Sequence, residues 1–160
     1  MSKKSKQILV LGVGNILLGD EGAGVKALEL MQERYDFSDN VEFLDGGTAG
    51  FELLSFLDNK TDLFIFDAII DDAKPGTVKK FNLDNPPAFF QDRISPHQLG
   101  LSEMLSTAAL TDDLPENITL FGIVPKTVDT GMELTGPVRE GVENMVDMAI
   151  DDLQTIGAVL

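Results

Sequence analysis

The chain has 160 residues, which suits one domain with a single core, and its 43% hydrophobic and 24% charged residues are typical of an ordered globular protein. Its 12 Lys and Arg stand against 27 Asp and Glu, and the net charge of −15 disfavours nucleic acid as a partner and favours a cation or a basic protein. The absence of cysteine excludes disulfides, thiolate metal sites and thiol nucleophiles.

Strands and helices are expected to alternate along the chain. Short apolar runs rich in branched or aromatic residues predict strands, and apolar residues at helical spacing predict helices. In chain order, the sequence predicts a strand at 8–13, a helix at 23–34, a strand at 41–44, a helix at 49–57 capped by Thr48, a strand at 63–66, an edge strand at 77–81, an irregular segment at 85–95, a helix at 98–109 that begins at Ser95-Pro96, a strand at 118–124 and a helix at 137–154. This alternation predicts a three-layer α/β/α fold of the phosphorylase or hydrolase-like kind. We expect a mostly parallel twisted sheet of about five strands, in one domain over residues 1–160.

The sequence shows no membrane or export signal. No apolar run approaches the roughly 20 residues that a membrane-spanning helix needs. The apolar run at 8–13 is too short for the core of a signal peptide. We therefore expect a cytoplasmic protein that has neither a membrane nor a nucleic acid as partner. A monomer is expected, although the sequence itself says little about the oligomeric state.

Acidic residues follow the first three predicted strands: Asp20 and Glu21 after the first, Asp45 after the second and Asp67 after the third. In open α/β sheets, the binding crevice lies beyond the carboxyl ends of the strands. Carboxylates gathered at that edge repel one another, and a divalent cation would keep them ionised. Any one of them alone more often caps a helix or faces water. Their convergence is what indicates a metal site.

His97 is the only histidine, so any imidazole chemistry must use it. A lone histidine is more often a surface or core residue than a ligand. This one lies in the first turn of the predicted helix, where the helix dipole disfavours the imidazolium form. A neutral imidazole together with carboxylate oxygens suits a divalent ion such as nickel, zinc or manganese.

Two other patterns favour different functions but are incomplete. Gly12-Val-Gly-Asn-Ile-Leu17 begins like a dinucleotide fingerprint, but its sixth position is Leu, and Asp45 lies beyond the usual spacing of about 20 residues. Asp129-Thr130-Gly131 matches the aspartic-protease triplet, which needs a second such carboxylate. H-E-x-x-H and G-x-S-x-G are absent. A nucleotide-dependent α/β enzyme therefore stays a distant alternative, and a conventional self-sufficient protease is not indicated.

Five segments in order resemble the signature of nickel-iron hydrogenase maturation endopeptidases. They are Leu11 to Gly24 (LGVGNILLGDEGAG), Leu44 to Gly50 (LDGGTAG), Phe66-Asp67-Ala68, Ser95 to Gly100 (SPHQLG) and Leu120 to Pro125 (LFGIVP). Each segment alone is a weak signal, but their order and spacing over nearly the whole chain make the resemblance specific.

The resemblance implies a function and a site. Such enzymes remove a short C-terminal extension from the hydrogenase large-subunit precursor once nickel has been loaded. Their metal-binding residues correspond to Glu21, Asp67 and His97, and these three with Asp45 are the expected catalytic residues. Nickel is presented by the substrate, other divalent cations are expected to substitute for it in vitro, and no further cofactor is expected. Whether the side chains cut or only recognise the metal stays open, as does the alternative of a non-catalytic chaperone for nickel or the large subunit.

Overall fold

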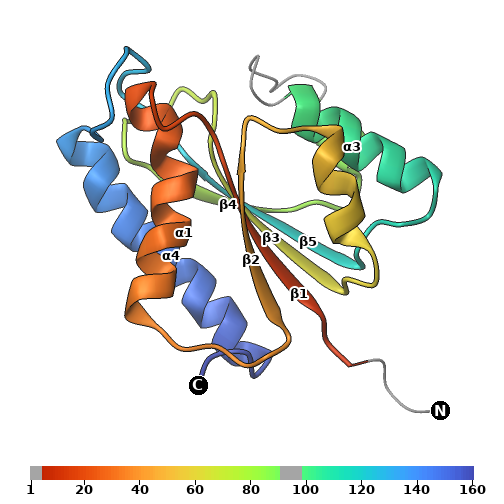
Figure 1. The fold of residues 1–160 in the computed structure, drawn as a ribbon. Coiled ribbons are helices and arrows are strands. Elements are labelled where there is room, and N and C mark those ends of the chain that lie inside the picture. Colours follow the sequence, from red (N-terminus) through yellow and green to blue (C-terminus); the bar gives the residue numbers. More distant parts are fainter. Residues whose placement is uncertain (1–4, 91–98) are drawn as a thin grey trace.

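The computed structural model describes residues 5–90 and 99–160 and shows an open five-stranded sheet between helices (Figure 1). The strands are β1 (Ile8–Val13), β2 (Val41–Gly47), β3 (Asp62–Ala68), β4 (Val78–Asn82) and β5 (Asn117–Ile123). They lie in the order β2-β1-β3-β5-β4, and all pairs are parallel except β4 with β5 at the edge. The predicted α/β class with a mostly parallel sheet is therefore confirmed.

The central strands are buried on both faces, which explains their continuous apolar runs. Every residue of β1 and of β3 is buried. Successive residues of β3 contribute to two separate cores: Phe64 and Phe66 to one, and Leu63 and Ile65 to the other. Helices cover both faces of these central strands, so we expect a binding site at the ends of the strands.

Helices cover each face of the sheet (Figure 1). On one face, α1 (Ala23–Arg34) packs beside α4 (Gly136–Thr155). On the other, the 3-10 helix η2 (Phe51–Leu57) packs beside α3 (Leu99–Leu110), which also contacts the short α2 (Pro86–Phe90). A short 3-10 helix, η1 (Gly19–Gly22), precedes α1. The bounds of α1 are those predicted, because its apolar spacing buries Val25, Leu28 and Met31 on one face.

The segment after β2 differs from its prediction. Instead of a helix at 49–57 capped by Thr48, the chain forms the shorter η2, with Gly50 as the N-cap residue and no side-chain cap bond from it. The carboxylate of Glu52 accepts the hydrogen bond of the Gly50 N–H, at 2.9 Å. The predicted cap at Thr48 was wrong, because Gly50 is the N-cap residue and the side-chain bond to its N–H comes from Glu52 within the first turn.

The segment predicted as irregular at 85–95 contains α2 in its described part. Two prolines at its start are compatible with a helix, because N–H groups in the first turn need no partner within the helix. Asn85 supports the start: its side chain accepts the Ala88 N–H at 3.4 Å, and its carbonyl accepts the Phe89 N–H at 3.1 Å. The predicted helix start at Ser95-Pro96 lies outside the described residues.

Two strands are longer than predicted. β2 continues past residue 44 to Gly47, and β3 continues past residue 66 to Ala68. The acidic and glycine residues interrupt the apolar runs in the sequence, but pairing with the neighbouring strand continues, as between Asp67 and Gly122 of β5. Asp45 and Asp67 therefore lie within the last three residues of their strands and not in loops.

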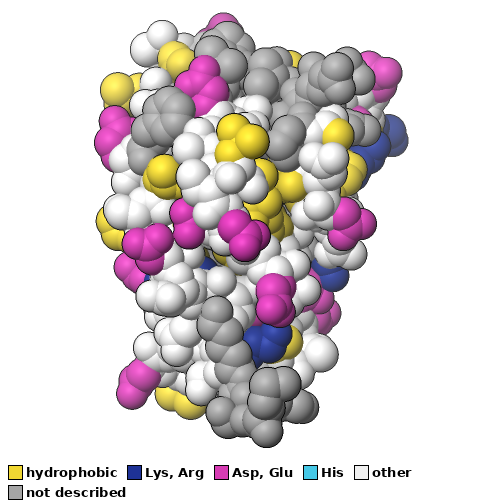
Figure 2. Space-filling model, turned by 90° about the vertical axis from the view of Figure 1, so that its right-hand side faces the viewer, with side chains coloured by type: hydrophobic (Ala, Val, Ile, Leu, Met, Phe, Trp, Pro, Cys, Tyr) yellow, Lys and Arg dark blue, Asp and Glu magenta, His cyan; other side chains and the backbone are white. Residues whose placement is uncertain are grey.

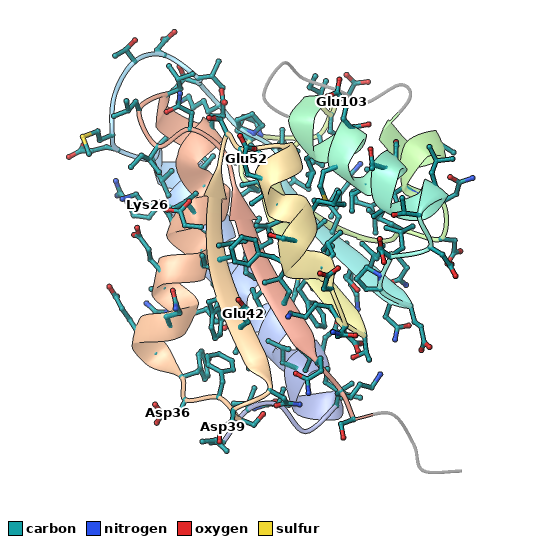
Figure 3. The ribbon with its side chains drawn as sticks, turned by 45° about the vertical axis from the view of Figure 1, so that its right-hand side comes forward. Lys26, Asp36, Asp39, Glu42, Glu52 and Glu103 are labelled. Atoms are coloured by element: carbon teal, nitrogen blue, oxygen red, sulfur yellow. The ribbon has the colours of Figure 1, made fainter. Side chains whose placement is uncertain are left out.

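The surface carries the excess of negative charge. Asp and Glu side chains are spread over the face seen in Figure 2, where Lys and Arg are few. Glu42, Glu52 and Glu103, on β2, η2 and α3, are exposed (Figure 3). A surface of this kind attracts cations and basic segments. Within the described ranges, no helix combines the length and apolarity that crossing a membrane requires.

Candidate active site at the carboxyl edge of the sheet

The carboxyl ends of β1, β2 and β3 meet at one level of the sheet, toward the top of Figure 1. The register pairs Gly12 of β1 with Asp45 on one side and with Phe66 on the other. Asp67 is the next residue of β3, and Glu21 lies in η1, which contacts β3. The structure thus brings three of the four predicted site residues to one edge.

Two glycines bring η1 and the start of α1 against the strand ends. A Cβ at Gly24 would overlap the carbonyl oxygens of Phe66 and Val13. Gly14 has a φ of +132°, and a Cβ there would overlap the carbonyl oxygen of Glu21. The lack of a side chain at both positions allows the backbone of Glu21 to lie close to the ends of β1 and β3. The side chain of Glu21 is half-buried there.

Asp67 brings a carboxylate into the protein interior. It is 0% exposed. Leu63 and Ile65, four and two residues earlier in β3, belong to the core beneath η2 and α3, so alternation directs Asp67 to that same face. Burying an ionised carboxylate costs free energy unless hydrogen bonds or positive charge compensate. A cation at the strand end would favour its ionised form.

Asp45 lies in different surroundings. It is exposed, and its Oδ1 accepts the N–H of Gly47 at 3.0 Å. Because the neighbouring Gly46 faces Leu11, in the core beneath η2 and α3, alternation directs Asp45 to the opposite face from Asp67. An open hollow of about 340 Å³ is lined by Asp45 and by Gly14, Asn15, Ile16, Leu17, Gly47 and Thr48. Asp45 therefore borders this hollow, with β1 between it and Asp67.

His97 lies outside the described residues, so its meeting with Glu21 and Asp67 stays a prediction. Within residues 5–90 and 99–160, no three acidic side chains are grouped closely enough to hold an ion by themselves. In the first turn of α3, Gly100 touches the loop after β2, where a Cβ at Gly50 would lie 3.0 Å from its Cα. The described start of α3 thus lies beside the same edge of the sheet.

The carboxylate of Asp20, next to Glu21 in η1, is 0% exposed and holds the loop between β5 and α4. Its Oδ2 accepts the N–H of Lys126 at 2.9 Å, the N–H of Thr127 at 3.1 Å and the hydroxyl of Thr135 at 2.8 Å. Its Oδ1 accepts the N–H of Thr135 at 2.8 Å. In return, the Asp20 N–H donates to the carbonyl of Thr127 at 3.0 Å. These bonds tie η1 to a loop far away in the sequence.

The hydrogen bonds also determine the charge state of Asp20. Burial raises the pKa of its carboxyl, but the bonds from Thr135, Lys126 and Thr127 favour the charged form and bring the net pKa below its ordinary value of 3.8. Protein donors thus stabilise the charge of Asp20, and the expectation that it shares a cation with the other acids was wrong. No local sequence pattern predicts these donors, because they lie 106 to 115 residues away.

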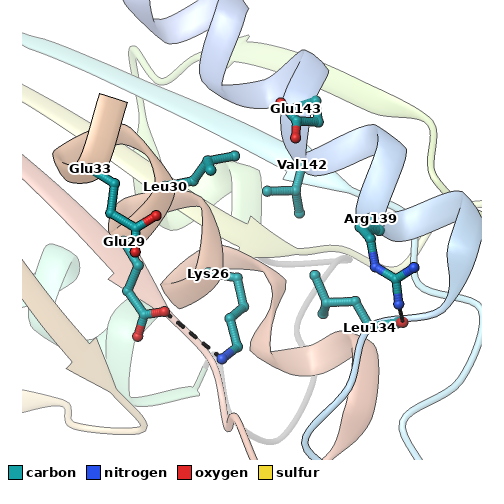
Figure 4. A pocket seen from close by; sticks show the side chains of 8 residues that line it. All are labelled: Lys26, Glu29, Leu30, Glu33, Leu134, Arg139, Val142 and Glu143. Carbon is teal, nitrogen blue, oxygen red and sulfur yellow. Dashed lines mark hydrogen bonds and ion pairs between the residues drawn. The ribbon is translucent and has the colours of Figure 1, made fainter. Parts of the chain in front are cut away.

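A second hollow lies between α1 and α4, away from the predicted residues (Figure 4). Its lining consists of Leu30, Leu134, Val142, Lys26, Glu29, Glu33, Arg139 and Glu143. Its cations have partners within it: Lys26 pairs with Glu29 at 3.8 Å, and Arg139 donates to the carbonyl of Leu134 at 3.1 Å. Since no predicted site residue lines it, the candidate site stays at the edge of the sheet.

The fold and its edge define an open α/β protein with carboxylates at the ends of its parallel strands, and comparisons with known proteins place it in a family. Residues 25–152 match the family model described as hydrogenase maturation protease. The chain is 43% identical over 152 residues to the Hydrogenase 2 maturation protease of Escherichia coli (strain K12), covering 94% of this chain and 93% of that one. It is 42% identical over 156 residues to the hydrogenase expression/formation protein HupD of Rhizobium leguminosarum bv. viciae, covering 96% and 77%.

Solved structures agree with this result. The hydrogenase maturating endopeptidase HybD from E. coli superposes with a TM-score of 0.90 at 42% identity, covering 95% of this chain and 94% of that one. The [NiFe] hydrogenase maturation protease HybD from Thermococcus kodakarensis gives a TM-score of 0.77 at 33% identity, covering 91% and 97%. The chain belongs to the hydrogenase maturation protease family, as its motifs predicted.

Proposed function

We propose that this protein is an endopeptidase that removes the C-terminal extension of the nickel-loaded large subunit of a nickel-iron hydrogenase during maturation. The observation that carries the proposal is the 43% identity to a hydrogenase maturation protease over 94% of the chain. It acts as a monomer in the cytoplasm on a protein partner. Helices on both faces of the sheet support a three-layer α/β/α description of the phosphorylase or hydrolase-like kind.

Glu21, Asp67 and His97 complete the coordination of nickel that the precursor brings with it. Two observations support this role. Glu21 lies on η1, which is packed against the end of β3, and Asp67 is a buried carboxylate near that end. Two carboxylates and an imidazole suit a borderline divalent ion such as nickel. Docking of the loaded ion therefore checks that metal insertion has preceded cleavage, and it brings the peptide bond to the sheet edge.

Cleavage adds one water across the peptide bond, its hydroxyl to the carbonyl carbon and its proton to the leaving nitrogen. The substrate's nickel supplies a Lewis acid that polarises the carbonyl or the water. Asp45 or Glu21 orients that water through a carboxylate oxygen. The exposed position of Asp45, in the hollow formed by the loops after β1 and β2, supports such a role. A protein of this kind needs no nucleophilic side chain of its own, in keeping with a sequence that lacks cysteine.

Mass spectrometry of a large-subunit precursor before and after incubation with the protein tests the proposal. The nickel-loaded precursor should lose mass at its C-terminus, and the nickel-free precursor should stay intact. A stable complex without any loss of mass would contradict the protease function and support a chaperone. Efficient cleavage of the nickel-free precursor would contradict the role of the metal.

A further inference from the structure

Large apolar side chains are exposed at one place beside the candidate site. Among the described side chains, the exposed large apolar ones are Leu17, Ile70, Leu110, Val128, Met132 and Leu160. Three of them, Leu17 (54% exposed), Val128 (51%) and Met132 (60%), belong to the two loops that leave β1 and β5 at the carboxyl edge. We refer to these three residues as the apolar rim. Exposed apolar groups that gather in one place are characteristic of interaction sites.

Main-chain hydrogen bonds join the two loops of the apolar rim. The Gly131 N–H donates to the carbonyl of Leu17 at 2.8 Å, and the Gly19 N–H donates to the carbonyl of Gly131 at 2.8 Å. Leu18 and Gly131 form a parallel bridge between these bonds. The buried carboxylate of Asp20 adds its bonds to the same loop. A surface held in this way is already ordered before a partner arrives, so binding costs little conformational entropy.

The apolar rim continues into the candidate site and has acidic neighbours. Leu17 also lines the hollow that contains Asp45. Asp129 and Glu133 are exposed and adjoin Val128 and Met132 in the sequence. Apolar side chains bordered by carboxylates are complementary to a segment that carries apolar residues next to Lys or Arg.

We propose that the apolar rim docks the large-subunit precursor through a segment of that precursor with apolar side chains next to Lys or Arg. This proposal rests on the proposed function and adds to it the surface that holds the substrate. Docking here places the bound chain beside the hollow of Asp45, so that part of the binding free energy comes from the precursor protein and not from nickel alone.

Steady-state kinetics with nickel-loaded precursor test the docking role. The variant Val128→Ser with Met132→Ser should raise KM about tenfold and leave kcat unchanged, because it removes contacts made equally before and during the reaction. Leu110→Ser is the matched control, since Leu110 is 89% exposed at the end of α3, outside the rim. The control should keep the wild-type KM, and all three proteins should unfold at the same temperature.

Charge reversal tests the chemistry of the docked segment. Asp129→Lys with Glu133→Lys should also raise KM, and added salt should reduce the difference from wild type because it screens exposed charges. If the wild-type protein trims the precursor and the serine variant does so with an unchanged KM, the docking proposal is wrong and the proposed function stands. If the wild-type protein leaves the nickel-loaded precursor uncut, the proposed function fails and the docking proposal fails with it.

Discussion

Two aspartates at the carboxyl edge of the sheet, Asp20 in η1 and Asp45 near the end of β2, lie in opposite surroundings. Asp20 is buried and accepts hydrogen bonds from Lys126, Thr127 and Thr135. Asp45 is exposed beside an open hollow and accepts a bond only two residues along, from Gly47. One carboxylate is used to join distant segments of the chain, and the other faces the space where a substrate could lie.

This difference separates residues that build the site from residues that face the substrate. The donors around Asp20 keep it ionised without a cation, and they fix the segment that carries Glu21. The adjacent acids Asp20 and Glu21 therefore have different roles, which their residue types alone do not reveal. The following experiments test that separation, beginning with the largest expected effect.

Removal of the imidazole should give the largest change in activity. His97→Ala is expected to lower trimming of the nickel-loaded precursor by at least about a hundredfold, because a metal ligand is lost. If His97 binds the substrate's nickel and has no part in folding, the free energy of unfolding should change by less than about 0.5 kcal/mol. Mass-spectrometric time courses and urea unfolding measure the two effects. Normal maturation by this variant would exclude His97 from the metal site.

Close packing of α1 against the strand ends should be sensitive to a single methyl group. Gly24→Ala places a Cβ into the carbonyl oxygens of Phe66 and Val13, and the free energy of unfolding should fall by about 2–3 kcal/mol. Gly136→Ala is the control, because a Cβ there meets nothing within 4 Å. Urea unfolding of both variants compares them, and equal stabilities would show that α1 can move away from the strand ends at little cost.

Neutralisation of the two aspartates should separate their roles. Asp20→Asn puts an amide N–H₂ against N–H and hydroxyl donors and should reduce the free energy of unfolding by about 2 kcal/mol. Asp45→Asn keeps an oxygen for the Gly47 N–H and should change it by less than about 0.5 kcal/mol. If Asp45 orients water, Asp45→Asn should lose more trimming activity than Asp20→Asn. A larger loss of stability at Asp45 would contradict the comparison.

The pH dependence of stability should reveal the ionised state of Asp20. Its pKa is lower in the folded protein than the ordinary 3.8, so its contribution is fully present above that value and is lost as the pH falls through the folded pKa. The difference in unfolding free energy between wild type and Asp20→Asn should be constant from about pH 7 to pH 5 and should narrow near pH 3. Glu143, whose pKa is lowered by its hydrogen bond from Arg34, is common to both proteins and cancels. A difference that widens on acidification would contradict the assignment.

The sequence was sufficient for the local parts of the fold. The apolar run from Ile8 to Val13 correctly predicted a buried strand, because both faces of that strand pack against a core. The spacing of apolar residues in α1 correctly predicted a helix, because it matches the one face that is buried. Strand ends at Gly47 and Ala68 were missed because pairing between strands continues through residues that are not apolar. The motifs were also sufficient to identify the family.

The candidate site was only partly predictable for a related reason. Glu21, Asp45 and Asp67 could be placed at one edge, because parallel strands end on the same side of a sheet. The face to which each side chain points depends on the register between the strands. Gly12 pairs with Asp45 and with Phe66, so Asp67 is one residue further along and points to the opposite face from Asp45. The partners of Asp20 lie more than a hundred residues along the chain, and the fold alone brings them together.

Anomalous X-ray diffraction from crystals grown with nickel would test most directly whether one ion joins the three predicted ligands. We predict a nickel peak about 2.0–2.2 Å from a carboxylate oxygen of Glu21, a carboxylate oxygen of Asp67 and a ring nitrogen of His97, the distances usual for a divalent ion of this kind. Nickel bound elsewhere, or these three side chains too far apart to share one ion, would contradict the proposed site.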